Sequence, residues 1–93
     1  MRSYNHAAAS AETAVLAENT GRLHTTKMGA ERIKRNIQLD ADNAIRLCQT
    51  AILNNTACAE RIGKNWYITV NSFILTVNAH SYTVITAHEK KPV

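Results

Sequence analysis

A chain of 93 residues has the length of one small domain. Its apolar content of 45% and charged content of 19% exclude a disordered chain. One proline and three glycines exclude a linker or a low-complexity tract, and the apolar runs are too short to span a bilayer. The alanine-rich start is too short and too interrupted for a signal peptide. We therefore expect one soluble, cytoplasmic domain over residues 1–93, with residues 1–9 flexible and no membrane partner.

The formal net charge of +4 is concentrated in one stretch, from Arg22 to Arg35. This stretch holds Arg22, Lys27, Arg32, Lys34 and Arg35 against Glu31 alone. A solvated helix face explains such a pattern in many proteins. It is also the pattern expected of a nucleic-acid binder or of a protein that docks on an acidic partner.

The sequence predicts no metal and no cofactor. The two cysteines, Cys48 and Cys58, lack metal-ligand or redox spacing and are expected to be reduced. His80 and His88 form no ligand-spaced pair with them. Carboxylates are scarce after residue 42, so a two-metal nuclease or phosphatase site cannot be assembled. No glycine-rich phosphate loop is present.

Three helices are predicted in the first half of the chain. Ser10 can cap a helix over residues 11–19, which Gly21 can end in a left-handed conformation. Thr25 and Thr26 precede a second helix, whose apolar positions are few: Met28, Ile33 and Ile37. A third helix, from Ala41 to about Leu53, follows Asp40 and carries apolar residues at helical spacing.

After Asn55 the apolar period changes from near four to two, which is typical of strands. The alternating segments are residues 57–62, 66–70, 73–78 and 82–88. We therefore predict an α+β fold with about three N-terminal helices, followed by a four-stranded antiparallel meander whose one face the helices cover. In the last segment Tyr82, Val84, Thr86 and His88 are expected to share one face by alternation.

Several polar residues precede helices or occupy turns. The free amides of the helix after His24, Thr25 and Thr26 favour an anion. Lys64 and Asn65 occupy a predicted hairpin turn. Each of these residues also has an ordinary explanation as a cap, a turn residue or a surface residue. Together with Arg32 and the last strand, they suggest metal-independent RNA cleavage, which needs a base, an acid and cations over the phosphate.

Three ordered motifs resemble a small uncharacterised family of bacterial and phage-borne proteins. They are LHTTxxGxERIxxN at residues 23–36, GKNWY at 63–67 and TVNAxSYTxITAH at 76–88. The resemblance covers about residues 23–90, whereas residues 1–22 match nothing in it.

More distantly, the layout is similar to the barnase–EndoU–colicin–RelE group of ribonucleases. That resemblance implies His24 and His88 as the acid/base pair and Arg32 and Lys64 as phosphate contacts. It implies assisting roles for Thr86 and Tyr82. No motif fixes which histidine is the acid and which the base.

Two functional hypotheses follow, and the sequence leaves open whether the chain is an enzyme. The first is a metal-independent endoribonuclease or RNA-binding domain of toxin or phage type, in which His24, Arg32, Lys64 and His88 converge in one cleft. The second is a non-catalytic inhibitor, similar to an anti-CRISPR, that binds an acidic protein or a nucleoprotein complex. In that case charge reversal of Arg32, Lys34 or Arg35 would abolish binding. A structural homodimer that pairs through a strand edge is a third interpretation.

Overall fold

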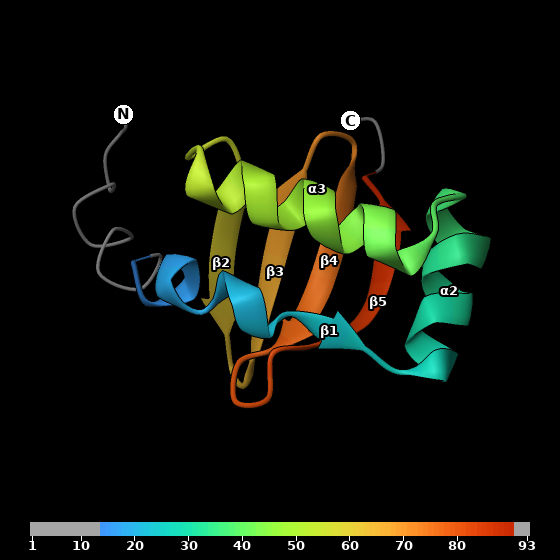
Figure 1. Ribbon diagram of the computed structural model, residues 1–93, viewed down its shortest axis with the longest axis horizontal. Coiled ribbons are helices and arrows are strands. Elements are labelled where there is room, and N and C mark those ends of the chain that lie inside the picture. Colours follow the sequence, from blue (N-terminus) through green and yellow to red (C-terminus); the bar gives the residue numbers. More distant parts are fainter. Residues whose placement is uncertain (1–13, 91–93) are drawn as a thin grey trace.

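The computed structural model describes residues 14–90 (Figure 1). The predicted flexible segment 1–9 and the predicted Ser10 cap lie outside the described residues. In chain order the elements are a helical segment at 14–18, the 3-10 helix η1 (Thr20–Arg22), β1 (His24–Thr25), α2 (Lys27–Ile37), α3 (Ala41–Leu53), β2 (Cys58–Ile62), β3 (Asn65–Val70), β4 (Phe73–Asn78) and β5 (Thr83–Glu89). The predicted α+β class is therefore confirmed.

Local chemistry defines the ends of α2. The Thr26 hydroxyl accepts a hydrogen bond from the Gly29 amide at 3.0 Å, which satisfies one free donor of the first turn. The helix ends at Gln38, which adopts a left-handed conformation with φ of 63°. Ile33 and Ile37 form the buried side of α2.

The third predicted helix agrees with α3 at both ends. Its buried residues recur at helical spacing: Ala44, Cys48, Ala51 and Ile52. Asp40 occupies the N-cap position, but its side chain does not accept from the first turn. It instead accepts from the Lys34 ammonium at 3.5 Å.

The sheet has five strands in the order β1-β5-β4-β3-β2, so the prediction of four strands is wrong by one. The strands β2 to β5 form the predicted antiparallel meander. The additional strand is β1, which pairs in parallel with the start of β5, His24 with Thr83 and Thr25 with Val84. Two residues are too short a segment for periodicity to reveal.

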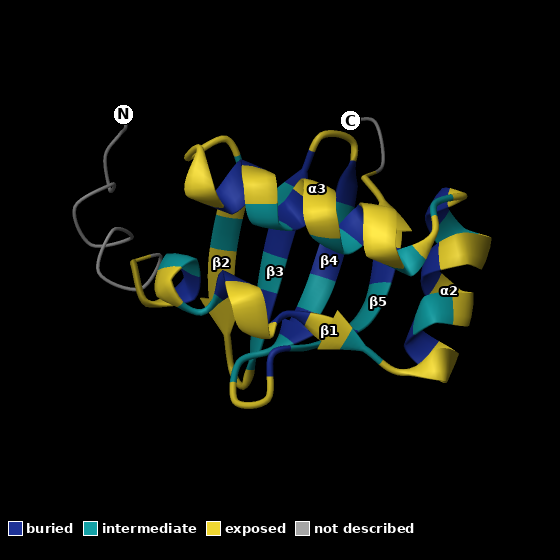
Figure 2. Cartoon of the chain, viewed as in Figure 1, coloured by how far each residue is buried: buried dark blue, intermediate teal, exposed yellow. Residues whose placement is uncertain are grey.

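The helices cover one face of the sheet, as predicted. In Figure 1, α3 lies across the front of the strands and α2 lies alongside β5. The strand residues beneath α3 are almost fully buried and alternate strictly with half-buried ones (Figure 2). They are Trp66, Ile68 and Val70 in β3 and Phe73, Leu75 and Val77 in β4. These residues, with those of α2 and α3, form one apolar core.

The opposite side of the sheet, called the open face below, is uncovered by the described residues. Every residue on it is half-buried or exposed. The strand register assigns to it Cys58, Glu60, Ile62, Asn65, Tyr67, Thr69, Ile74, Thr76, Asn78, Thr86 and His88.

A β-bulge in β5 corrects the predicted face of the last strand. Thr76 pairs with Thr86 and Val77 pairs with Val84, so Ile85 is an extra residue opposite this step. Because of this shift, Val84 faces the core whereas Thr86 and His88 lie on the open face. Tyr82 precedes the strand with φ of 61° and is only 5% exposed. It therefore does not share a face with Thr86 and His88.

Two predictions in the helical half are also wrong. Gly21 lies inside η1 and is not a left-handed helix stop. Met28, predicted on the apolar side of α2, is 59% exposed. The buried position in this first turn belongs to Gly29, where a Cβ would lie 2.9 Å from the Val84 carbonyl oxygen of β5. None of the helices in residues 14–90 has the length and apolar character needed to cross a membrane.

Substitution of Gly29 tests how closely α2 packs on β5. A Cβ at this position would clash with the Thr25 hydroxyl and lie 2.9 Å from the Val84 carbonyl oxygen. We expect Gly29→Ala to lower the free energy of unfolding by about 1–3 kcal/mol, although alanine favours helices. Urea denaturation measures the change. Gly21→Ala is the control, since a Cβ there meets no atom within 4 Å. Equal stability of the two variants would contradict the packing described.

The two cysteines should differ in reactivity. Burial raises the pKa of the Cys48 thiol to about 12, whereas Cys58 is exposed on β2. Because the thiolate is the reactive form, a disulfide reagent at pH 8 should label one thiol quickly and the second only after unfolding. Cys58→Ser should remove the fast reaction. Rapid labelling of two thiols in the folded protein would show that Cys48 is accessible.

Candidate nucleic-acid interface

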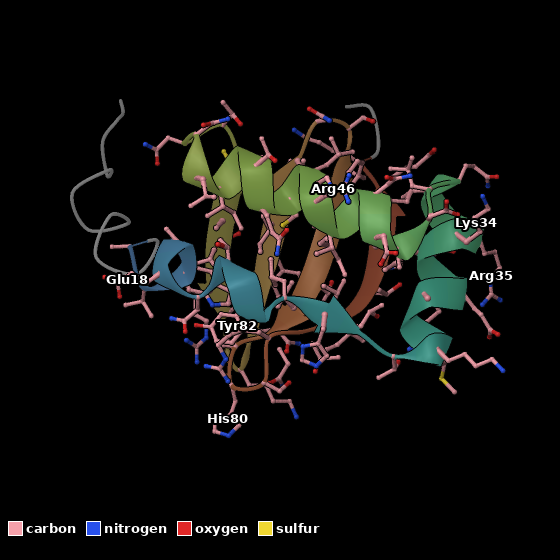
Figure 3. The ribbon with its side chains drawn as sticks, in the orientation of Figure 1. Glu18, Lys34, Arg35, Arg46, His80 and Tyr82 are labelled. Atoms are coloured by element: carbon pink, nitrogen blue, oxygen red, sulfur yellow. The ribbon has the colours of Figure 1, made fainter. Side chains whose placement is uncertain are left out.

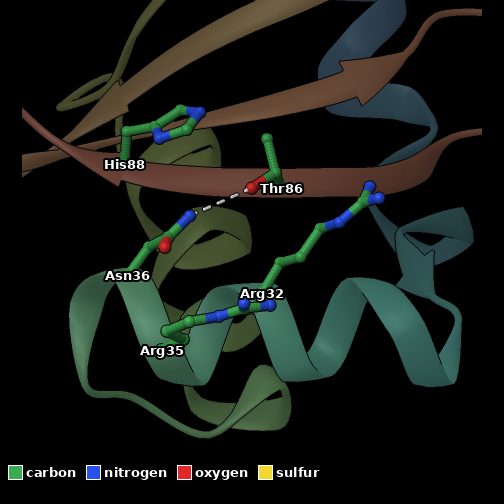
Figure 4. A pocket seen from close by; sticks show the side chains of 5 residues that line it. All are labelled: Arg32, Arg35, Asn36, Thr86 and His88. Carbon is green, nitrogen blue, oxygen red and sulfur yellow. Dashed lines mark hydrogen bonds between the residues drawn. The ribbon is translucent and has the colours of Figure 1, made fainter.

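A shallow pocket of about 350 Å³ lies between α2 and the second half of β5, and is called the α2–β5 pocket below. Arg32, Arg35 and Asn36 line it from α2, and Thr86 and His88 line it from β5 (Figure 4). Four of these five residues are sequence-predicted site residues, and the structure brings them together. Asn36 is the fifth.

Helical spacing places the α2 residues in the pocket. Arg32, Arg35 and Asn36 are separated by three and four positions and so share one side of the helix, next to the buried side of Ile33 and Ile37. On β5, Thr86 and His88 are two positions apart and therefore lie on one face. The pocket thus lies where this side of α2 meets the open face.

Asn36 fixes the distance between the two elements. Its amide nitrogen donates to the Ala87 carbonyl oxygen at 3.0 Å and contacts the Thr86 hydroxyl oxygen at 3.4 Å. The second contact is drawn in Figure 4. The strand β1 pairs only with Thr83 and Val84, so it does not reach Ala87 further along β5. The Asn36 side chain therefore supplies the hydrogen bond that the Ala87 carbonyl would otherwise lack on this edge.

The pocket has a positive electrostatic character. Within residues 14–90 the one salt bridge joins Lys34 to Asp40, so neither Arg32 nor Arg35 is paired with a carboxylate. The pocket lining contains no carboxylate. Figure 4 shows the Arg32 guanidinium on the opposite side of Thr86 from His88. Guanidinium groups bind phosphate through charge-assisted hydrogen bonds, and a hydroxyl or an imidazole can add a further donor.

His24 lies outside this pocket, in a separate hydrogen-bond network at the start of β5. Its Nε2 lies 3.2 Å from the Thr83 hydroxyl and its Nδ1 lies 2.8 Å from the Arg22 carbonyl oxygen. The Thr83 hydroxyl also contacts the Ser81 hydroxyl at 2.8 Å. The network joins β1 to β5 three residues before Thr86, so the structure does not bring His24 to His88.

The hydroxyls of Thr25 and Thr26 make hydrogen bonds within the fold. Thr25 donates to the Val84 carbonyl oxygen at 2.7 Å, which ties the end of β1 to β5. Thr26 accepts from the first turn of α2. Lys34 extends from the outer side of α2, with Asp40 as its partner (Figure 3).

The remaining sequence-predicted residues also lie outside the pocket. Lys64 is exposed in the turn between β2 and β3, where its carbonyl oxygen accepts from the Ala79 amide at 2.9 Å. Asn65, predicted in that turn, is instead the first residue of β3 and lies on the open face. Its amide oxygen is buried without a hydrogen-bond partner among the described residues. The ring of Tyr82 is buried beneath the Arg22 guanidinium, 4.7 Å from the ring centroid. Burial removes Tyr82 from any accessible phosphate site.

Sequence reasoning missed Asn36 and Tyr67 as functional candidates. Asn36 follows Arg32 by four residues, so its position on the same helix side was available from spacing. Tyr67 lies on the open face in the same cross-strand row as Thr86, a relation that depends on the register of three strands. Within residues 14–90, no three His, Cys, Asp or Glu side chains are grouped as a metal site.

Comparison with known proteins places the chain in a family. The family model described as "Protein of unknown function (DUF3781)" matches residues 17–88, which is most of the chain, so the chain belongs to this family. The match begins before residue 23, so the prediction that residues 1–22 lie outside the family is wrong for residues 17–22. The matched range includes every residue of the α2–β5 pocket. Comparisons with curated proteins and with solved structures gave no match.

Proposed function

We propose that this protein binds RNA and that the α2–β5 pocket holds a phosphate of the RNA backbone. The observation that carries the proposal is that Arg32 and Arg35 form no salt bridge with any carboxylate in residues 14–90. Both lie beside Thr86 and His88, at the margin of the open face. Arginine suits this role because its planar fork of donors matches phosphate geometry.

The polar groups beside the arginines favour RNA as the ligand. The hydroxyl of Thr86 both donates and accepts, as does the ribose 2′-hydroxyl that distinguishes RNA from DNA. Next to it on the open face lies Thr76, directly opposite in β4. A ribose attached to the bound phosphate would meet these hydroxyls first.

The geometry supports binding rather than cleavage. Cleavage without a metal requires a base for the 2′-hydroxyl and an acid for the leaving oxygen. His88 is the one imidazole that lines the pocket, and His24 is engaged with Thr83 near the start of β5. The proposal is therefore for an RNA-binding domain, with His88 as a phosphate contact.

Charge reversal tests the proposal. Binding of a fluorescent oligoribonucleotide is measured by anisotropy at several salt concentrations, in the presence of a chelator. Arg32→Glu and Arg35→Glu should each weaken binding by about tenfold or more, because each turns a phosphate contact into a repulsion. For a single-stranded oligoribonucleotide, loss of one phosphate contact should also reduce by about 0.7 the salt slope, the steepness with which the logarithm of the binding constant falls with the logarithm of the salt concentration.

Arg46→Glu is the matched control for both variants. Arg46 is exposed on α3, across the sheet from the open face, and its reversal changes the net charge equally (Figure 3). It should leave affinity nearly unchanged. No RNA binding by the wild-type protein, or equal losses in all three variants, would contradict the proposal. RNA cleavage that His88→Ala abolishes would overturn the assignment to binding alone.

A further inference from the structure

One cross-strand row of the open face begins at the α2–β5 pocket. Thr86 in β5 pairs with Thr76 in β4, which pairs with Tyr67 in β3, which pairs with Glu60 in β2. All four side chains point to the open face, and each is half-buried or exposed. One end of the row thus lies beside the arginines near β5, and the other end is the carboxylate of Glu60 on the edge strand β2. The aromatic ring of Tyr67 lies between these ends.

The nearest neighbours of Tyr67 on the open face, along its strand and directly across from it, are polar. Along β3 its neighbours on this face are Asn65 and Thr69, and across the sheet they are Thr76 and Glu60. No described helix covers this position. Within residues 14–90, Tyr67 is the one Phe, Trp or Tyr residue that the register assigns to the open face, and its ring is partly exposed. A partly exposed aromatic ring among polar side chains is the environment of a stacking platform.

The spacing of the row suits one nucleotide. Adjacent strands are about 4.8 Å apart, so Tyr67 and Thr86, two strands apart, are separated by roughly 10 Å. This is of the order of the span from a nucleotide's phosphate to the far side of its base. A phosphate held by Arg32 and His88 would place its base over Thr76 and Tyr67.

The charges at the two ends of this row have opposite signs and would orient a bound nucleotide. The arginines lie beside β5 and Glu60 lies at the far end, on β2. A carboxylate repels a phosphate and accepts hydrogen bonds from the exocyclic amino groups of bases. The backbone is thus directed toward β5 and the base toward β2.

We infer that Tyr67 is the stacking platform for a base of the bound RNA and that the ligand is single-stranded RNA. The inference rests on the proposed function, since the pocket must first hold the phosphate. Bases in a duplex are stacked on one another and paired at their edges, so they cannot reach the ring. Unpaired bases can reach it, and stacking on an aromatic ring accepts any base.

Three substitutions of Tyr67 separate stacking from other effects. Tyr67→Ala and Tyr67→Leu should each weaken binding of a single-stranded oligoribonucleotide by about tenfold, because both remove the aromatic face. Tyr67→Phe should stay within about twofold of the wild type, because it keeps the ring. Leucine retains apolar bulk on the sheet and controls for loss of packing. Thermal unfolding monitors the stability of each variant.

Two further readouts distinguish the outcomes. The salt slope should be unchanged in Tyr67→Leu, because stacking releases no counterions. A hairpin of the same base composition should bind more weakly than the single strand. Wild-type affinity in Tyr67→Leu, with a loss in Arg32→Glu, would overturn the inference and leave the proposed function standing. Equal affinity for single strand and hairpin would also overturn it. Absence of RNA binding by the wild type would overturn both.

Discussion

The structure depends on how the outer edge of β5 is satisfied. A strand edge presents unpaired carbonyl and amide groups. In β5 a short strand pairs with one part of this edge, and a side chain of α2 forms hydrogen bonds with another part. The short strand β1 pairs with Thr83 and Val84, and the Thr25 hydroxyl adds a bond to Val84. Beyond β1, the Asn36 side chain donates to Ala87. These bonds hold α2 against β5, and the absence of a side chain at Gly29 permits the close approach.

The same arrangement creates the candidate interface. With α2 held along the edge, the helix side that carries Arg32 and Arg35 extends to the margin of the open face. The bulge at Ile85 then sets which β5 residues meet it, because it turns Val84 to the core and Thr86 to the open face. A cationic helix side and a polar, aromatic sheet face thus become one continuous surface.

Local patterns were sufficient to predict much of this. The bounds of α3 and the four strands of the meander follow from residue spacing and from the capping and turn residues between them. Three features depend on long-range pairing and could not be predicted: the strand β1, the bulge in β5 and the separation of His24 from His88. The alternating pattern predicts Tyr82 in the last strand, but its positive φ and its burial place it in the turn before β5.

The most direct test of the account is an NMR titration of ¹⁵N-labelled protein with a short single-stranded oligoribonucleotide. The account predicts that the largest amide shift changes occur at Thr86 and His88 in β5, at Tyr67 in β3 and along the Arg32 side of α2. Changes confined to the exposed surface of α3 around Asn43, Arg46 and Leu47 would contradict it, because that surface lies on the other side of the sheet.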